Sequence, residues 1–165
     1  MNFKIINTFI FDVDGVLTDG GLHAHADGEQ TRVFNIKDGF AMEKAVKAGY
    51  NMVIISGVDE KGVRLRLERL GVKDIFLGIK DKLALFNDYI KEKNLKPDTI
   101  LYMGDDIPDY KIMKLVGLPT CPDDAIDDIK EISRYISPFD GGKGAARDVI
   151  ERVMNAQDKW LKDQW

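Results

Sequence analysis

The chain has 165 residues, 44% of them hydrophobic, and a formal net charge of −4, which indicates one globular domain over 1–165 with a sizeable core. The acidic balance argues against nucleic acid as a partner, and we expect no membrane attachment because no apolar run approaches the ~20 residues that cross a bilayer and no signal-peptide pattern is present. The single cysteine, Cys121, permits no internal disulfide, so the sequence predicts a cytoplasmic protein.

Short β-rich runs alternate with amphipathic helical stretches along the chain. Strands are expected at 8–13, 51–55, 74–77, 99–103 and 118–121. Helices are expected to begin near Gly39, Asp59, Asp81, Ile107, Asp124 and Gly144. This alternation predicts an α/β fold, a doubly wound parallel sheet with helices on both faces. Ligands of such sheets bind beyond the carboxyl ends of the strands, so functional side chains are expected there.

Residues 19–35 interrupt the alternation with a predicted β-hairpin. Asp27-Gly28, flanked by alternating residues, is typical of a hairpin turn. We expect the hairpin to stand over the functional site because it follows the first strand so closely. His23 and His25 could be metal ligands, but no cysteine or third histidine lies nearby, and the residues favour an exposed hairpin face.

Two carboxylates, Asp12 and Asp14, directly follow the first strand. Burying a carboxylate is costly unless a cation or hydrogen bonds compensate. The pair therefore predicts a metal site, or a nucleophile with its acid/base partner. The alternative is an Asx turn, in which the side chains only cap backbone N–H groups.

A second acidic cluster follows the strand predicted at 99–103. It consists of Asp105, Asp106 and Asp109, whose like charges would repel without a cation. Asp109 could instead cap the following helix.

Polar residues also follow the second and third strands. Ser56-Gly57 could be an ordinary helix N-cap or could serve the same site. Lys82 opens a helix, where the macrodipole disfavours a cation, and this position indicates a functional role. Lys80 is interpreted as a solvated surface charge.

Taken in order, these motifs resemble those of the haloacid dehalogenase (HAD) superfamily phosphatases. The four motifs read Asp12-Val-Asp14-Gly-Val-Leu-Thr18, Ile-Ile-Ser56-Gly57, Lys82 and Gly-Asp105-Asp106-Ile-Pro-Asp109. Three further segments resemble the 3-deoxy-D-manno-octulosonate 8-phosphate phosphatase family: Asp-Gly-Val-Leu-Thr-Asp-Gly over 14–20, Phe34 to Gly39, and Gly141 to Arg147. The resemblance implies a Rossmann-like HAD fold with an inserted hairpin, no cap domain, and a tail with the last helix over 141–165.

The resemblance also implies Mg²⁺-dependent hydrolysis of a phosphate monoester through an aspartyl phosphate. Asp12 would be the nucleophile and Asp14 the acid/base. Mg²⁺ would be held by Asp12, the backbone carbonyl of Asp14, and Asp105. Phosphate would be bound by Ser56, Gly57 and Lys82. Asp106 would hold a metal-bound water or orient Lys82, with Asp109 also counted as a secondary residue.

The substrate expected from the resemblance is a 2-keto-3-deoxy sugar-acid phosphate. Family members generally show Ser/Thr-Gly-Arg at the second motif, whereas this chain has Ser56-Gly57-Val58. That departure favours 2-keto-3-deoxynononate 9-phosphate, with 3-deoxy-D-manno-octulosonate 8-phosphate as the alternative.

Candidate specificity residues lie on two predicted helices. Arg64 is the strongest because a guanidinium suits a carboxylate, although Glu60 and Arg64 could also be an ordinary i, i+4 ion pair. The remaining candidates are Glu60, Lys61, Lys37 and Asp38. The resemblance implies a homotetramer in which hairpins and a neighbouring subunit close each site.

Two other functions use similar residues. A phospho-receiver switch places its acidic pair and its phospho-acceptor on different strands, whereas Asp12 and Asp14 share one strand end. A sugar phosphomutase of the same superfamily usually carries a cap. Both are less well supported than the phosphatase.

Overall fold

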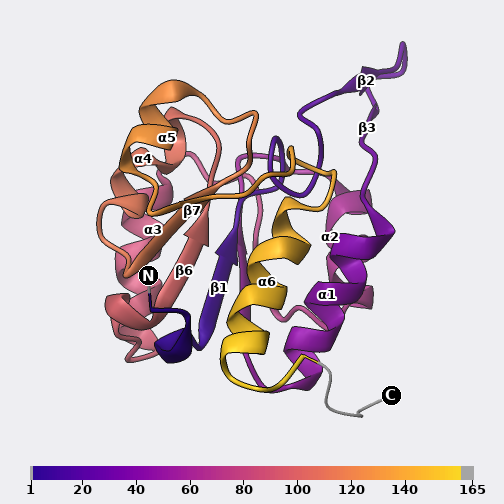
Figure 1. Ribbon diagram of the computed structural model, residues 1–165. Helices are drawn as coiled ribbons and strands as arrows, with labels where there is room; N and C mark the ends of the chain where they lie inside the picture. The colour runs from indigo at the N-terminus through magenta and orange to yellow at the C-terminus, as the bar shows by residue number, and fades with distance from the viewer. Residues whose placement is uncertain (1, 161–165) are drawn as a thin grey trace.

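A parallel sheet of six strands forms the centre of residues 2–160, which are the residues described by the computed structural model (Figure 1). In spatial order the strands are β5 (Asp74–Phe76), β4 (Asn51–Ile55), β1 (Thr8–Phe11), β6 (Ile100–Met103), β7 (Leu118–Cys121) and β8 (Tyr135–Ile136). Every neighbouring pair is parallel, which confirms the predicted doubly wound fold. The edge strand β8 was not predicted, because two residues are too short for an apolar run.

The side chains of the central strands alternate between two hydrophobic cores. In β1, Phe9 and Phe11 belong to one core and Ile10 to the other. In β6, Met103 and Tyr102 divide between the two cores in the same way. This period of two is the geometry of a strand buried on both faces, so both faces require helical cover.

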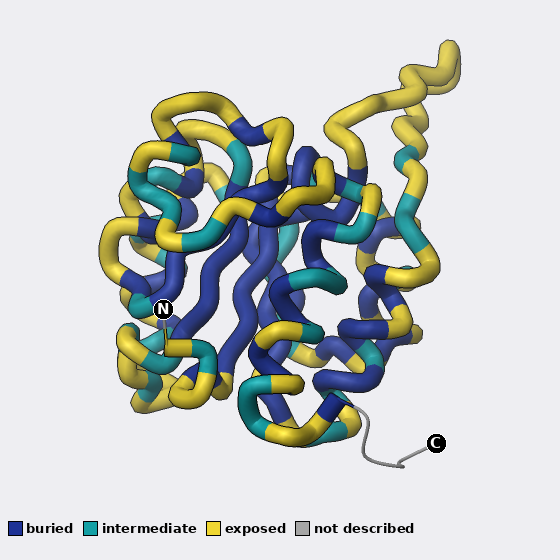
Figure 2. The backbone as a smooth tube through the Cα atoms, in the orientation of Figure 1, coloured by how far each residue is buried: buried dark blue, intermediate teal, exposed yellow. Residues whose placement is uncertain are grey.

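Three helices cover each face of the sheet over the described residues. Buried residues of α1 (Ile36–Lys47), α2 (Lys61–Arg69) and α6 (Ala145–Ala156) pack in one core. Those of α3 (Lys82–Glu92), α4 (Ile107–Met113) and α5 (Asp127–Ile132) pack in the other. Short 3₁₀ turns, η1 (Phe3–Ile5) and η2 (Pro97–Thr99), precede β1 and β6. Figure 2 shows the result, a buried sheet surrounded by helices whose outer surfaces are exposed.

Two helices begin away from the predicted residues. Helix α1 begins at Ile36, before Gly39, because the Asn35 side chain accepts the N–H of Lys37 and caps the helix there. Helix α5 begins at Asp127 and not near Asp124.

The predicted hairpin is present as β2 (His23–Ala24) and β3 (Gln30–Thr31), an antiparallel pair. It projects away from the body of the protein, beyond α1 and α2 in the view of Figure 1. The histidines lie on this exposed arm, where His25 Nε2 pairs with Thr31 Oγ1 at 3.1 Å. The interpretation as an exposed hairpin face is confirmed.

The segment before α6 packs against the loop that follows β1. The N–H of Gly142 donates to the carbonyl of Val16 at 2.9 Å, and Asn35 Nδ2 donates to the carbonyl of Gly142 at 3.1 Å. Residues 161–165, the end of the predicted tail, lie outside the described residues. Among the described helices, none combines the length and apolar character needed to cross a membrane.

Candidate active site

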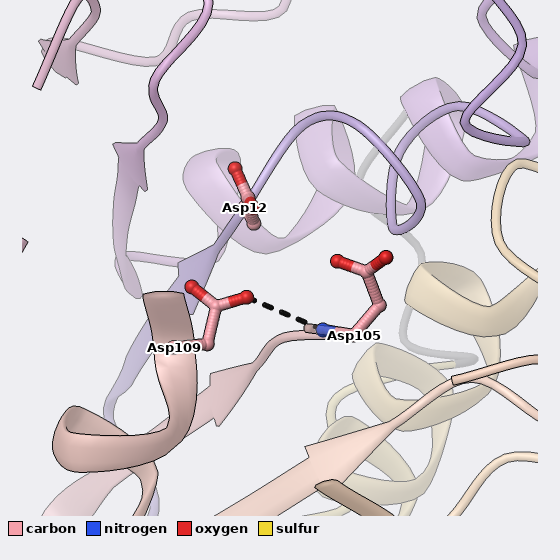
Figure 3. Close-up of side chains that lie close together, drawn as sticks. All are labelled: Asp12, Asp105 and Asp109. Carbon is pink, nitrogen blue, oxygen red and sulfur yellow. Dashed lines mark hydrogen bonds between the residues drawn. The ribbon is translucent and has the colours of Figure 1, made fainter. Parts of the chain in front are cut away.

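The acidic residues converge at the carboxyl ends of the two central strands. The chain winds from β1 toward β4 on one side and places β6 on the other, so ligands are expected near the end of β1. Asp12 follows β1, Asp105 follows β6, and Asp109 lies in the first turn of α4. Carboxylate oxygens of these three residues lie within 4.8 Å of one another (Figure 3).

Lys82 bridges two of these carboxylates. As the first residue of α3, it donates from Nζ to Asp12 Oδ2 at 2.6 Å and to Asp109 Oδ1 at 2.8 Å. The side chains of Lys82, Asp12 and Asp109 are 5%, 12% and 0% exposed. A buried lysine at a helix N-terminus is therefore stabilised here by two anionic partners, which accounts for the unfavourable position noted in the sequence.

The Asp109 carboxylate contacts three other residues of the site. Its Oδ1 also accepts the hydroxyl of Tyr102 at 2.6 Å, and its Oδ2 accepts the N–H of Asp105 at 3.3 Å (Figure 3). The alternative that Asp109 caps the helix is wrong, because the N-cap of α4 is Asp106. Asp106 is exposed and accepts the N–H of Ile107, while Asp12 and Asp109 are the carboxylates that contact Lys82.

The electrostatics of the cluster follow from burial and from the closeness of like charges. Burial, reinforced by the charge of Asp109, raises the pKa of Asp12 to about 6. Burial and the charge of Asp12 raise the pKa of Asp105 to about 7. Burial alone would lower the pKa of Lys82, but the charges of Asp12 and Asp109 outweigh it and the pKa rises. The cluster therefore holds more negative charge than one ammonium group balances.

This donor set fits a divalent cation. Carboxylate oxygens are the ligands that Mg²⁺ prefers. The raised pKa values of Asp12 and Asp105 reflect burial first and repulsion between the carboxylates second, and a bound cation would offset both. Asp109 is already engaged by Lys82, Tyr102 and Asp105, so Asp12 and Asp105 are better placed to offer ligand oxygens.

Asp14 makes a separate contact that the sequence did not reveal. Its two oxygens accept from Arg32 Nε at 2.7 Å and Arg32 Nη2 at 3.0 Å, and Oδ1 also accepts from Thr18 Oγ1 at 3.3 Å. Arg32 directly follows β3, so this pairing depends on the path of the chain as it returns from the hairpin to the body of the protein. The sequence carried only a weak signal, a basic residue at the base of the hairpin.

A cavity of about 820 Å³ opens over these residues and includes Asp12, Asp14, Lys82 and Asp105 in its wall. Ser56, Gly57 and Val58 also line it. Lys80, interpreted above as a solvated charge, is exposed but also lies in the wall, together with Lys111.

Gly15 allows the two strand ends to approach each other in this cavity. Its φ is +76°, and a Cβ there would overlap the carboxylate of Asp105. A side chain at this position would therefore be strained in its backbone and would displace a cluster residue.

The candidate specificity residues are not in the part of the cavity wall that the described residues form. Asp38 is buried between helices, where Oδ1 accepts the N–H of Arg147 at 2.8 Å, so the prediction that it contacts substrate is wrong. Arg64 donates from Nη1 to the carbonyl of Ile75 at 3.4 Å. Lys37 and Lys61 are exposed and Glu60 is half-buried, all outside the wall.

Several known proteins with similar sequences and structures are named as sugar-acid phosphatases. The 3-deoxy-D-manno-octulosonate 8-phosphate phosphatase KdsC of Escherichia coli K12 is 34% identical over 154 residues, covering 93% of this chain and 82% of the relative. The crystal structure of that phosphatase from Yersinia pestis superposes with a TM-score of 0.94 at 31% identity, covering 97% of this chain and 86% of the other.

A third relative was solved with ligands. The phosphatase of the same name from Moraxella catarrhalis, in complex with magnesium, phosphate and a KDO molecule, gives a TM-score of 0.91 at 31% identity and covers 94% of this chain and 90% of its own. No protein-family model matches the chain. With this identity over most of its length, and an acidic cluster at the carboxyl ends of a doubly wound sheet, the chain belongs to the KdsC family of HAD-superfamily phosphatases.

Proposed function

We propose that this sugar-acid phosphatase hydrolyses 3-deoxy-D-manno-octulosonate 8-phosphate. The observation that carries the hydrolase chemistry is the buried Asp12–Lys82–Asp109 bridge beside Asp105 and Asp14. The substrate named for the relatives supports the octulosonate over the 2-keto-3-deoxynononate 9-phosphate that Val58 led us to expect. Val58 lies in the cavity wall and is the residue on which that second candidate rests.

Asp12 is the proposed nucleophile. A carboxylate oxygen of Asp12 forms a bond to phosphorus as the bond from phosphorus to the sugar oxygen breaks. The leaving alkoxide takes a proton from the carboxyl group of Asp14. Lys82 Nζ and the N–H of Val13, which donates to Asp12 Oδ1 at 2.6 Å, hold the attacking carboxylate in place.

Hydrolysis of the aspartyl phosphate uses the same two residues. Asp14, now a carboxylate, takes a proton from a water molecule whose oxygen attacks phosphorus. The bond between phosphorus and Asp12 breaks, which releases inorganic phosphate and restores both residues to their starting states.

The negatively charged phosphoryl oxygens are repelled by the surrounding carboxylates, so they need hydrogen-bond donors. Lys82, the hydroxyl of Ser56 and the N–H of Gly57 would bind them. Asp12, Asp105 and the backbone carbonyl of Asp14 would hold Mg²⁺, which supplies positive charge against the phosphoryl oxygens when bound. Asp106 is exposed in the cavity wall and would act on a water molecule or another group bound in the cavity.

The proposed enzyme is a single-domain cytoplasmic homotetramer. The proposed subunit contact is supported by apolar side chains that are exposed near the hairpin, with Ile36 79% and Val33 67% exposed. In such an assembly, Lys37, Glu60, Lys61 and Arg64 would be free to serve a neighbouring subunit's cavity, since they do not line their own.

The test is phosphate release from a panel of sugar phosphates with Mg²⁺. We expect the highest kcat/KM for 3-deoxy-D-manno-octulosonate 8-phosphate, with activity lost in EDTA and restored by Mg²⁺. A higher kcat/KM for the nononate 9-phosphate would overturn the substrate assignment alone. A stable phosphoprotein without turnover would indicate a receiver switch, and transfer of phosphate between sugar positions would indicate a mutase.

A further inference from the structure

The ion pair between Arg32 and Asp14 joins the hairpin to the cavity. The guanidinium meets both carboxylate oxygens, through Nε at 2.7 Å and Nη2 at 3.0 Å. Such a two-point contact fixes the plane of a carboxylate as well as its position. The Arg32 side chain is 7% exposed, whereas the Asp14 side chain is 42% exposed and faces the cavity.

The pair joins two different segments of the chain. Arg32 follows β3 of the hairpin, and Asp14 belongs to the loop after β1. Apart from Arg32, the one side chain that bonds the Asp14 carboxylate among the described residues is Thr18, whose Oγ1 lies 3.3 Å from Oδ1. Without Arg32, this one 3.3 Å contact would be left to limit rotation of the carboxylate about its terminal bond, whose torsional wells are broad.

One nitrogen of the Arg32 guanidinium takes no part in the contact with Asp14. Its Nη1 is buried, and no hydrogen-bond partner is present among the described residues. Burying an unpaired donor is costly, so packing alone gives no reason to hold a guanidinium here. The contact with Asp14 is the interaction for which this arginine is positioned.

We propose that Arg32 is a positioning residue that orients the Asp14 carboxylate for proton transfer and couples the base of the hairpin to the cavity. The inference rests on the proposed function, in which Asp14 moves the proton. A misplacement of about 1 Å in a catalytic group can cost on the order of 100-fold in rate. Arg32 acts on catalysis through Asp14 and does not itself contact the substrate.

The experiment is a double-mutant cycle with Arg32→Ala and Asp14→Asn. Single-turnover rates of inorganic phosphate release from p-nitrophenyl phosphate, which include the hydrolysis of the aspartyl phosphate with Asp14 as base, are measured in the wild type, both single variants and the double variant. We expect Arg32→Ala to lower the rate on the order of 100-fold when Asp14 is present, and by less than about threefold when it is combined with Asp14→Asn. Equal fold losses in both backgrounds would overturn the inference, because a general effect on folding would be felt in each.

A second measurement tests the inference if the Asp14→Asn variant reacts too slowly for its rate to be measured. An alkyl phosphate needs a proton on its leaving oxygen, whereas p-nitrophenolate leaves without one. Arg32→Ala should therefore slow phosphoryl transfer from the alkyl phosphate at least about tenfold more than from the aryl phosphate. Equal losses for both substrates would overturn the inference.

Control variants separate orientation from hairpin stability. Thr31→Ala, at the position next to Arg32, removes the contact with His25 across the hairpin and should leave both rates unchanged. Arg32→Lys keeps the charge but loses the two-point geometry, and an intermediate rate is expected. If Asp14→Asn itself leaves the alkyl phosphate rate unchanged, the proposed role of Asp14 fails, which is distinct from a failure of Arg32 to couple to it.

Discussion

The Asp12–Lys82–Asp109 bridge contains two carboxylates and one ammonium group, so substitutions at its three residues should have different effects. Asp109 is fully buried, and its two carboxylate oxygens accept hydrogen bonds from Lys82, Tyr102 and the N–H of Asp105. Asp12 is held by Lys82 but also faces the cavity. The two carboxylates share one lysine, so removing the lysine and removing Asp12 have opposite electrostatic consequences.

Replacing Asp12 by Asn should separate activity from stability. An amide is a poor nucleophile, so kcat should fall more than about 1,000-fold. The pKa of Asp12 is raised to about 6, above its ordinary value, so its ionised form destabilises the folded protein above that pH. Asp12→Asn should therefore not lower the unfolding temperature at pH 8 in EDTA, as measured by circular dichroism. Retained turnover would mean that another residue is the nucleophile.

Replacing Lys82 by Met should destabilise the protein as well as inactivate it. The change leaves Asp12 and Asp109 buried without their shared cation, and breaking a buried pair in this way costs about 3–5 kcal/mol. Urea unfolding at pH 8 measures the loss, which should shrink at pH 5 because Asp12, with a pKa of about 6, is then protonated.

Lys80→Met is the matched control for that variant. Lys80 is exposed in the same cavity wall and should change the free energy of unfolding by no more than about 0.5 kcal/mol. A Lys82 variant as stable as its Lys80 control would show that the bridge does not support the fold.

Several of the residues that the sequence identified lie just beyond the ends of strands. Asp12, Ser56 and Asp105 could be placed at one edge of the sheet because parallel strands end together. Arg32 could not, since its partner depends on the path of the hairpin. Asp38 was misassigned for a related reason: its partner, the N-terminus of α6, lies more than a hundred residues along the chain.

At the scale of the elements, the N-terminus of α6 is capped by a side chain from another helix. Its N-cap is Gly144, which has no side chain to accept the first N–H groups. Asp38 of α1 accepts the N–H of Arg147 at 2.8 Å and replaces that cap. Burial raises the pKa of Asp38 despite this bond.

Asp38→Ala tests this capping. Loss of a cap should lower the free energy of unfolding by about 1 kcal/mol. Because the pKa of Asp38 is raised on folding, the folded state holds its proton more tightly, and its stabilising contribution falls as pH rises above the ordinary value of 3.8. The loss should thus be larger at pH 4.5 than at pH 7.5 in urea titrations.

The control for Asp38 is on the same helix. Glu43→Ala removes an exposed ion pair with Lys47 and should change stability by no more than about 0.5 kcal/mol at either pH. A pH-independent loss in the Asp38 variant would contradict burial as the source of its raised pKa.

At the scale of the whole molecule, the hairpin and the start of α1 form an unusual surface. Ile36 and Val33 are 79% and 67% exposed, beside an arm that projects from the body (Figures 1 and 2). Apolar residues exposed together are typical of a contact with another protein. A neighbouring subunit at this surface would also help to exclude water from the cavity.

Ile36→Asp should therefore disrupt the proposed tetramer, because a carboxylate buried at a subunit contact would lack a partner. Size-exclusion chromatography with light scattering should give a tetramer for the wild type and a smaller species for the variant. Leu115→Asp is the control, since Leu115 is also exposed, at 48%, but follows α4, whose core lies on the opposite face of the sheet. An unchanged mass for Ile36→Asp, or loss of the tetramer in both variants, would place the subunit contact elsewhere.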